Sequence, residues 1–187
     1  MSKKITKSGS HLREFLARLS SFLVRNKIDY MIIGGFALPA YGAIRATLDL
    51  DLAIRIPTSE EFQNLILMAE RSGFKPSSAS FNNPVMVLVE EKTGIEVELW
   101  LRPDGIVWDQ ETMDRRKKVR IGPSDFYVAS PEDFIVSKLA RPDRGVQDEK
   151  DVKSVLTRME GKIDRQYLQK RASKAGVLTI LEAIERV

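Results

Sequence analysis

Cysteine is absent from this chain of 187 residues, and histidine occurs once, as His11. Without cysteine there can be no disulfide bond, no thiolate ligand for a metal and no cysteine nucleophile. With a single histidine we expect neither a Ser-His-Asp triad nor a histidine-rich metal site. Any bound metal must therefore be held by oxygen atoms, which favours Mg²⁺, Mn²⁺ or Ca²⁺.

Long hydrophobic runs are also missing. No apolar stretch reaches the ~18 residues that a membrane span requires, and no apolar signal core follows residues 1–7. We therefore expect a cytoplasmic protein that spans no membrane. Hydrophobic residues make up 43% of the chain and charged residues 30%. This composition suits one domain with an ordinary core, or such a domain with a small helical appendage.

Basic residues are concentrated in two places. Residues 1–27 hold seven basic residues and one acidic residue, and 115–120 is a second basic run. Either patch could attract nucleic acid or nucleotide phosphates, and either could equally be an ordinary solvated surface. The oligomeric state is left open by these patterns.

Hydrophobic periodicity predicts a mixed α/β part followed by helices only. In the first part we expect helices at 10–27, 36–41 and 58–72, and strands at 30–33, 48–56, 85–89, 95–101, 118–121 and 126–128. Pro39 should lie in the first turn of its short helix. Ser130 to Asp133 has the pattern of a capped helix start, and further helices are expected at 146–159, 164–174 and 177–186. The predicted fold is α/β (α+β), with a mixed sheet flanked by helices over 1–128 and a helical bundle over 129–187.

Two aspartates stand out in the strand expected at 48–56. Side chains two residues apart project from the same face of a strand, so Asp49 and Asp51 should project together. Leu48, Leu50 and Leu52 should then point into the core. Two carboxylates at 4 Å repel each other by about 4 kcal/mol at an effective dielectric of about 20, so a protein keeps such a pair only with compensation. A shared proton, an arginine or a divalent cation would provide it.

Neighbouring residues offer such compensation. Arg45 and Thr47 have the same parity as the two aspartates, provided the strand extends that far back. Glu96 and Glu98 share one face of the strand at 95–101, and if this strand lies beside the aspartates, one glutamate should be about 5 Å away. We favour Glu98 for this role and a plain solvated position for Glu96, although the sequence leaves the choice open. Three carboxylates around one point would hold Mg²⁺.

A glycine pair precedes the aspartates by fifteen residues. Gly34 and Gly35 stand between a buried strand and a helix start, where a backbone without side chains can approach a ligand closely. Free N–H groups at a helix start favour an anion such as phosphate. A Gly-Gly turn, a short helix and Asp-x-Asp on the next strand together resemble the signature of the nucleotidyltransferase superfamily related to DNA polymerase beta.

The longer segment Arg45-x-Thr47-x-Asp49-x-Asp51 is similar to that of abortive-infection and toxin–antitoxin nucleotidyltransferases and of small antibiotic-modifying relatives. The residues from Ser130 to Leu139, followed by Arg141, Arg144, Asp148 and Asp151, support this closer match, which covers about residues 28–157. Two departures are a Gly-Gly turn where many members have Gly-Ser, and a glutamate as third carboxylate where aspartate is commoner.

The resemblance implies an enzyme that uses Mg²⁺ (or Mn²⁺) to transfer a nucleoside monophosphate from an NTP such as ATP to an acceptor hydroxyl. It implies metal ligation and catalysis by Asp49, Asp51 and Glu98, with Lys138 as a further catalytic residue. It implies nucleotide binding by Gly34, Gly35, Arg45, Thr47, Lys138 and Asp148. The acceptor, whether tRNA or another RNA, a protein or a small molecule, and the base preference are left open.

Other interpretations of the same residues remain. Asp148 and Asp151 lie on the inward stripe of the helix at 146–159, and inward carboxylates need partners. A Lys138–Asp148 contact would satisfy both groups, so this pair is as well explained by structure as by phosphate binding. An alternative for the whole chain is a non-catalytic nucleotide-binding or RNA-binding module that retains the fold. A third is a structural protein whose acidic pair is an ordinary surface feature.

Overall fold

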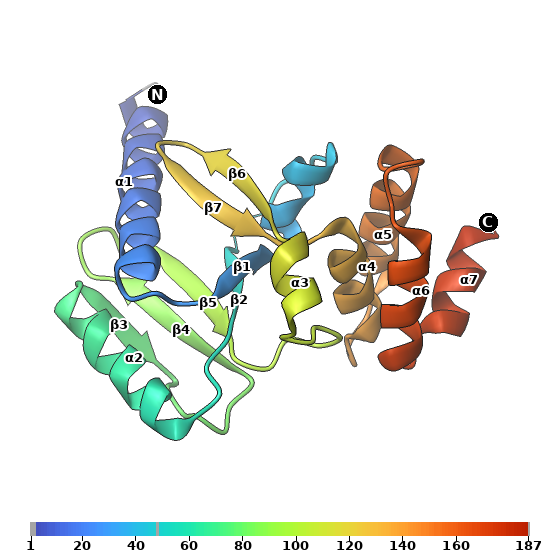
Figure 1. Cartoon of the computed structure of the whole chain (residues 1–187). Coiled ribbons are helices and arrows are strands. Elements are labelled where there is room, and N and C mark those ends of the chain that lie inside the picture. Colours follow the sequence, from blue (N-terminus) through green and yellow to red (C-terminus); the bar gives the residue numbers. More distant parts are fainter. Residues whose placement is uncertain (1–2, 48, 187) are drawn as a thin grey trace.

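The fold is built on a mixed sheet, seen in the computed structural model, which describes residues 3–47 and 49–186 (Figure 1). Its seven strands run in the order β3-β4-β5-β2-β1-β7-β6. The strands are β1 Tyr30–Ile33, β2 Asp51–Ile54, β3 Phe74–Ser77, β4 Val85–Glu90, β5 Glu96–Trp100, β6 Lys117–Ile121 and β7 Ser124–Val128. β2 pairs with β5 in parallel and with β1 antiparallel, so the aspartate strand lies at the centre of the sheet.

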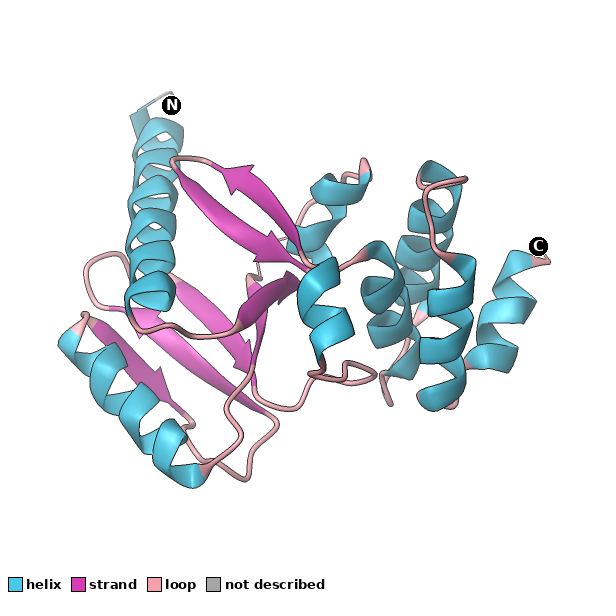
Figure 2. Ribbon diagram, viewed as in Figure 1, coloured by secondary structure: helices cyan, strands magenta, loops and turns pink. Residues whose placement is uncertain are grey.

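Helices lie beside the sheet and at one side of it. The first part of the chain contributes α1 Lys3–Arg25, the 3-10 helix η1 Gly34–Tyr41, α2 Ser59–Arg71 and α3 Gln110–Arg115. The second part contributes α4 Pro131–Ala140, α5 Val146–Arg158, α6 Arg165–Lys174 and α7 Leu178–Glu185. These last four gather into one group beyond the sheet (Figure 2). Among the described residues, no helix is both long enough and apolar enough to cross a membrane.

One hydrophobic core joins the sheet to the C-terminal helices. The buried cluster runs from Phe15 of α1 through Phe126 of β7 and Phe134 of α4 to Leu181 of α7. α4 is buried along its length from Pro131 to Leu139, because it lies between the sheet and the other helices. The boundary predicted near residue 128 is a change from strands to helices, and the division into two domains stays a prediction.

The capped start of α4 is present as predicted. The backbone N–H of Asp133 donates to the hydroxyl of Ser130 at 3.0 Å, and that hydroxyl donates to the Asp133 carboxylate at 2.9 Å. Pro131 occupies the first turn, where its missing N–H does no harm. This cap sets where α4 begins and therefore which of its side chains face the sheet.

Several expectations at the centre of the chain were wrong. The strand expected at 48–56 is shorter: β2 begins at Asp51 and ends at Ile54, and Leu48 lies outside the described residues. Arg45, Thr47 and Asp49 therefore belong to a loop. The short helix is a 3-10 helix that starts at Gly34, so Pro39 lies inside it and not in its first turn.

The sequence analysis did not predict two of the elements, β3 and α3. β3 is an edge strand that contains Pro76, a residue that weakens any strand prediction. α3 has only six residues, too few to show a helical repeat. The other strands and helices occur where the sequence predicts them, within a few residues at the ends, and α1 begins earlier than expected.

We expect loss of the ion pair between α3 and α6 to lower stability. Arg171 is 2% exposed, and its two Nη atoms donate to the Asp109 carboxylate at 2.7 and 2.5 Å. Asp109→Ala would leave the buried guanidinium without its main partner, so unfolding should become easier by about 2–3 kcal/mol, below the cost for a fully buried pair because Asp109 is partly exposed. Thermal denaturation would measure this loss, with Asp114→Ala on the exposed side of α3 as control.

The same pair predicts a pH dependence. The bonds from Arg171 hold the pKa of Asp109 well below its usual value. A lowered pKa in the folded state means that the stabilisation is present above the unfolded pKa of about 3.9 and is lost as the pH falls below it. The stability difference between the native chain and Asp109→Ala should therefore shrink on acidification; a difference that grows would contradict the assignment.

Candidate active site

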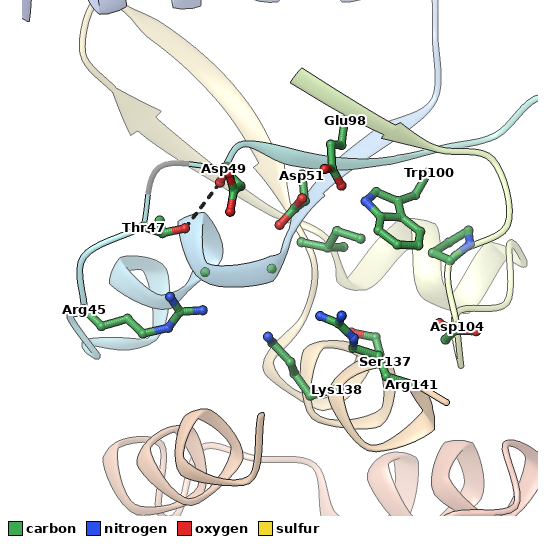
Figure 3. A pocket seen from close by; sticks show the side chains of 14 residues that line it. Arg45, Thr47, Asp49, Asp51, Glu98, Trp100, Asp104, Ser137, Lys138 and Arg141 are labelled. Atoms are coloured by element: carbon green, nitrogen blue, oxygen red, sulfur yellow. Dashed lines mark hydrogen bonds between the residues drawn. The ribbon is translucent and has the colours of Figure 1, made fainter. Parts of the chain in front are cut away.

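A polar cavity of about 280 Å³ lies where β1 ends and β2 begins, beside the last residues of β5, and α4 passes beneath them (Figure 3). The predicted residues Gly34, Gly35, Arg45, Thr47, Asp49, Asp51, Glu98 and Lys138 all line it. The other lining residues are Ile33, Trp100, Pro103, Asp104, Ser137 and Arg141. Asp148 does not line the cavity but contacts Lys138 from behind it. The tertiary structure thus brings together residues from four separate segments of the chain.

Two of the predicted carboxylates meet. Asp51 and Glu98 are direct partners in the parallel pairing of β2 with β5, so their side chains stand next to each other. Burial, the negative charge of Glu98 and a hydrogen bond between the two carboxyl groups raise the pKa of Asp51 to about 6. The sequence predicted such repulsion between Asp49 and Asp51, whereas the strand pairing places it between Asp51 and Glu98. Glu96 is exposed, pairs opposite Val89 and does not reach the cavity.

Asp49 is not part of this strand pairing, although its charge acts on Asp51. It lies in the loop before β2 with an exposed side chain, and the hydroxyl of Thr47 donates to its backbone carbonyl at 3.5 Å. Over residues 3–47 and 49–186, no three acidic or histidine side chains are close enough to form a ready set of metal ligands. Of the three carboxylates that the sequence analysis expected to meet, Asp51 and Glu98 do so. Asp49 lines the same cavity with an exposed side chain.

The glycine turn is shaped by its neighbours. Gly34 has a φ of +63°, and a Cβ atom there would lie 1.9 Å from the Oδ2 atom of Asp51. A Cβ on Gly35 would lie 2.8 Å from a guanidinium nitrogen of Arg45 and 3.0 Å from the Cβ of Thr47. Both glycines are needed because an acidic side chain and a basic one pack directly on the backbone.

Gly34→Ala should therefore damage the site. The added methyl group would force Asp51 away from its position and would strain a backbone with positive φ, at a cost of about 1–3 kcal/mol. We expect a clear drop in melting temperature together with loss of nucleotide binding. Gly42→Ala is a matched control, because Gly42 also has a positive φ but has open space around its Cβ position. Equal nucleotide binding by the two variants would contradict this account of Gly34.

Two basic residues of the cavity are held by buried aspartates. Lys138, 5% exposed, donates to Asp148 at 2.8 Å and lies 3.3 Å from Asp151. Arg45 makes a forked contact with Asp151, with distances of 3.1 to 3.3 Å. Burial alone would raise the pKa of Asp148, but the bonds from Lys138 and from the Gly145 N–H lower it. The predicted Lys138–Asp148 contact is thus present, within a four-membered ionic cluster of Arg45, Lys138, Asp148 and Asp151.

Comparison with known families identifies the fold that carries this cavity. The family described as "Nucleotidyl transferase of unknown function (DUF2204)" matches residues 12–177, which is most of the chain. The chain belongs to this nucleotidyltransferase family. The match includes the glycine turn, both paired carboxylates and the ionic cluster. Comparison with curated protein sequences finds no significant match.

Solved structures support the nucleotidyltransferase fold. An antigenic nucleotidyltransferase-like protein from Paracoccidioides brasiliensis aligns with a TM-score of 0.54 and 21% identity, over 92% of this chain and 91% of that one. The lincosamide antibiotic adenylyltransferase LnuA, bound to lincomycin, aligns with a TM-score of 0.51 and 16% identity, over 75% and 93%. The antibiotic-resistance factor ANT(2'')-Ia aligns with a TM-score of 0.59 and 14% identity, over 95% and 98%. At these identities the likeness is one of fold.

Arg141, which the sequence motif of this nucleotidyltransferase contains but to which the sequence analysis gave no role, lines the cavity. It follows α4 directly and reaches the cavity three residues after Lys138, which places both on one side of the helix. Its guanidinium makes a forked pair with Asp143 at 3.0 and 2.9 Å. The helical spacing from Lys138 was the available signal. Asp104 and Ser137, which also line the cavity, had no distinguishing pattern in the sequence.

One of the two tryptophans lines the cavity, and the basic run at 115–120 does not. Trp100 lines the cavity, but Trp108 packs against a small buried cluster around Met31 and does not line it. Of the basic run at 115–120, Arg115 pairs with Asp164, and Lys118 and Arg120 both pair with Asp125. Three residues of that run therefore have acidic partners within the nucleotidyltransferase itself.

Proposed function

We propose that this protein transfers a nucleoside monophosphate from a nucleoside triphosphate to a hydroxyl group of an acceptor and releases pyrophosphate. The observation that supports the proposal most is the meeting of Asp51 and Glu98 directly beside the backbone of Gly34. A plain structural pair of strands has no need to set two repelling, half-buried carboxylates side by side with one of them against a glycine turn. A site for a phosphate chain and its counter-ion does.

Phosphate binding falls to the glycine turn. η1 begins at Gly34, and the residue before it provides no side-chain cap for the first N–H groups. Such free N–H groups at a helix start bind anions well. Gly34 and Gly35 would therefore cradle the phosphates, with Thr47 beside them. Arg45 and Lys138 would line the wall of the cavity beside the phosphates while they keep their contacts with the buried aspartates.

The carboxylates fit a divalent cation by their chemistry. Asp51 and Glu98 offer adjacent oxygen ligands whose mutual repulsion a cation would relieve, and Asp49 lines the same cavity. We propose that these three residues hold Mg²⁺ or Mn²⁺. When bound, the ion supplies positive charge that offsets the charge of the phosphates and of the transition state.

The reaction can then be written in terms of the residues present. The acceptor oxygen forms a bond with the α-phosphorus while the bond from that phosphorus to the oxygen bridging the α- and β-phosphates breaks. Pyrophosphate leaves with the electron pair of the broken bond. The acceptor proton passes to the Glu98 carboxylate, which lies at the reaction centre next to Asp51.

The acceptor is to be sought in several classes. Structural neighbours include a lincosamide adenylyltransferase and a complex of ANT(2'')-Ia with adenylyl-2''-tobramycin, so hydroxyl-bearing antibiotics belong in the test set. Total tRNA and proteins belong there as well, because both carry free hydroxyl groups.

The experiment is to incubate the protein with each NTP labelled at the α-phosphorus, together with these acceptor pools. We expect label on one class of acceptor and release of pyrophosphate, both dependent on Mg²⁺ or Mn²⁺. A non-catalytic module would instead show binding of nucleotide or RNA, seen as a thermal shift, with no transfer of label from any of the four NTPs. That result would overturn the proposed function.

A further inference from the structure

The basic residues of the cavity differ in how tightly the protein itself holds them. Arg45 and Lys138 are bound to Asp148 and Asp151, and the side chains of these two aspartates are 11% and 3% exposed. Drawing Lys138 away would leave the buried Asp148 carboxylate with only a long contact to Arg141, and losing one partner of a buried ion pair is strongly destabilising. The two positive and two negative charges of the ionic cluster sum to zero. This ionic cluster is therefore a neutral wall that cannot easily give up a cation to a substrate.

Arg141 is held differently. Its main partner, Asp143, is 72% exposed and does not line the cavity, while the Arg141 side chain is 37% exposed. Ion pairs in such exposed positions contribute little to stability. The second contact of Arg141, with Asp148, is a long one of 3.8 Å. Arg141 can therefore exchange a surface carboxylate for another anion at little cost.

Arg141 also lies where such an anion would be. It lines the same cavity as Gly34 and Asp51, and its guanidinium points into that cavity beside Lys138 (Figure 3). A guanidinium donates two parallel hydrogen bonds to phosphate as it does to carboxylate. The forked contact with Asp143 shows that the group already adopts the geometry which a phosphate needs.

We propose that Arg141 is the phosphate-binding cation of this site and that it exchanges Asp143 for the β- or γ-phosphate of the bound NTP. The role is a catalytic one, because the guanidinium would touch the pyrophosphate group that leaves. It rests on the proposed function for the nature of the ligand. It differs from what the sequence suggests, since it moves the direct phosphate contact from Lys138 to Arg141.

The test compares nucleotides that differ only in their phosphates. Affinities of the full chain for AMP, ADP and ATP are measured with Mg²⁺ by calorimetry. Arg141→Gln should weaken ATP binding about 10- to 100-fold, as expected for loss of a charge-assisted forked contact, and should leave AMP binding unchanged. Arg141→Lys should recover only part, because an ammonium cannot make the forked contact. Arg186→Gln, an exposed charge loss far from the cavity, serves as control.

Asp143→Asn supplies a prediction of opposite sign. Without its surface competitor, Arg141 should bind ATP about 2- to 5-fold more tightly. ATP affinity that is unchanged in Arg141→Gln, equal weakening of all three nucleotides, or weaker ATP binding by Asp143→Asn would each overturn the proposal. If the native chain binds and transfers nucleotide and Arg141→Gln binds ATP with the same affinity, the inference about Arg141 fails and the proposed function stands. If the native chain binds no nucleotide, the proposed function itself fails.

Discussion

Asp51→Asn should reduce nucleotidyl transfer by at least about 100- to 1,000-fold, the loss seen when a charged group that stabilises a transition state is removed. The protein should not lose stability. Asp51 and Glu98 repel each other in the native fold, and the raised pKa of Asp51 means that ionisation of this carboxyl opposes folding as the pH rises from about 4 towards 6. Asparagine keeps the shape of the side chain and removes that charge. Transfer of label from an NTP and thermal denaturation at neutral pH measure the two effects.

A matched pair on β5 controls this prediction. Glu98→Gln removes the carboxylate that adjoins Asp51, and Glu96→Gln removes an exposed carboxylate two residues away on the same strand. Transfer should be lost in the first variant and kept in the second. Label transfer by Asp51→Asn at the native rate would refute the assignment of the reaction centre. A melting temperature of Asp51→Asn well below that of the native chain would contradict the repulsion between Asp51 and Glu98.

Lys138→Met should have the largest effect on stability. The ammonium group lies between Asp148 and Asp151, and its removal leaves Asp151 paired with Arg45 but leaves Asp148 with only a long contact to Arg141. Breaking a buried ion pair by removal of one partner costs about 3–5 kcal/mol. For a chain of this length the melting temperature should then fall by about 10 °C. Calorimetric or spectroscopic melting would measure the change.

Two further variants separate this effect from a general loss of charge. Lys153→Met removes an exposed lysine of α5 and should leave the melting temperature nearly unchanged. The double variant Lys138→Met with Asp148→Asn removes the unpaired charge as well and should recover part of the lost stability, because the two sites are coupled. If Lys138→Met has the same melting temperature as the native chain, the ion pairs of Lys138 do not stabilise the fold. Lys138 would then be available to bind phosphate.

The sequence predicted those features of the site that depend only on residues close to one another in the chain. The alternation of Glu96, Val97 and Glu98 predicted one exposed face, and the buried run at 30–33 predicted a strand with the glycine turn after it. The cap at Ser130 predicted the start of α4 to the residue. These features follow from side-chain parity in strands and from the unpaired N–H groups at a helix start, which are short-range effects.

Long-range contacts account for what was wrong. Parity placed Arg45, Thr47 and Asp49 on a strand, yet Arg45 reaches across to Asp151, more than a hundred residues later, and the chain before Asp51 forms a loop. No local pattern contains that ion pair. The same holds for Arg141, whose place beside the glycine turn depends on how α4 packs under the sheet.

The amino-acid order alone determined the kinds of groups available to this protein: oxygen ligands without thiols, a glycine turn, and acidic residues spaced to share a face. Packing decided which of them meet. The parallel register of β2 against β5 put Asp51 next to Glu98 and left Asp49 at the rim, and burial of Asp148 and Asp151 bound two cations and left Arg141 exchangeable. The physical reason is that charge interactions depend on distance and burial in three dimensions, which the spacing of residues along a chain does not contain.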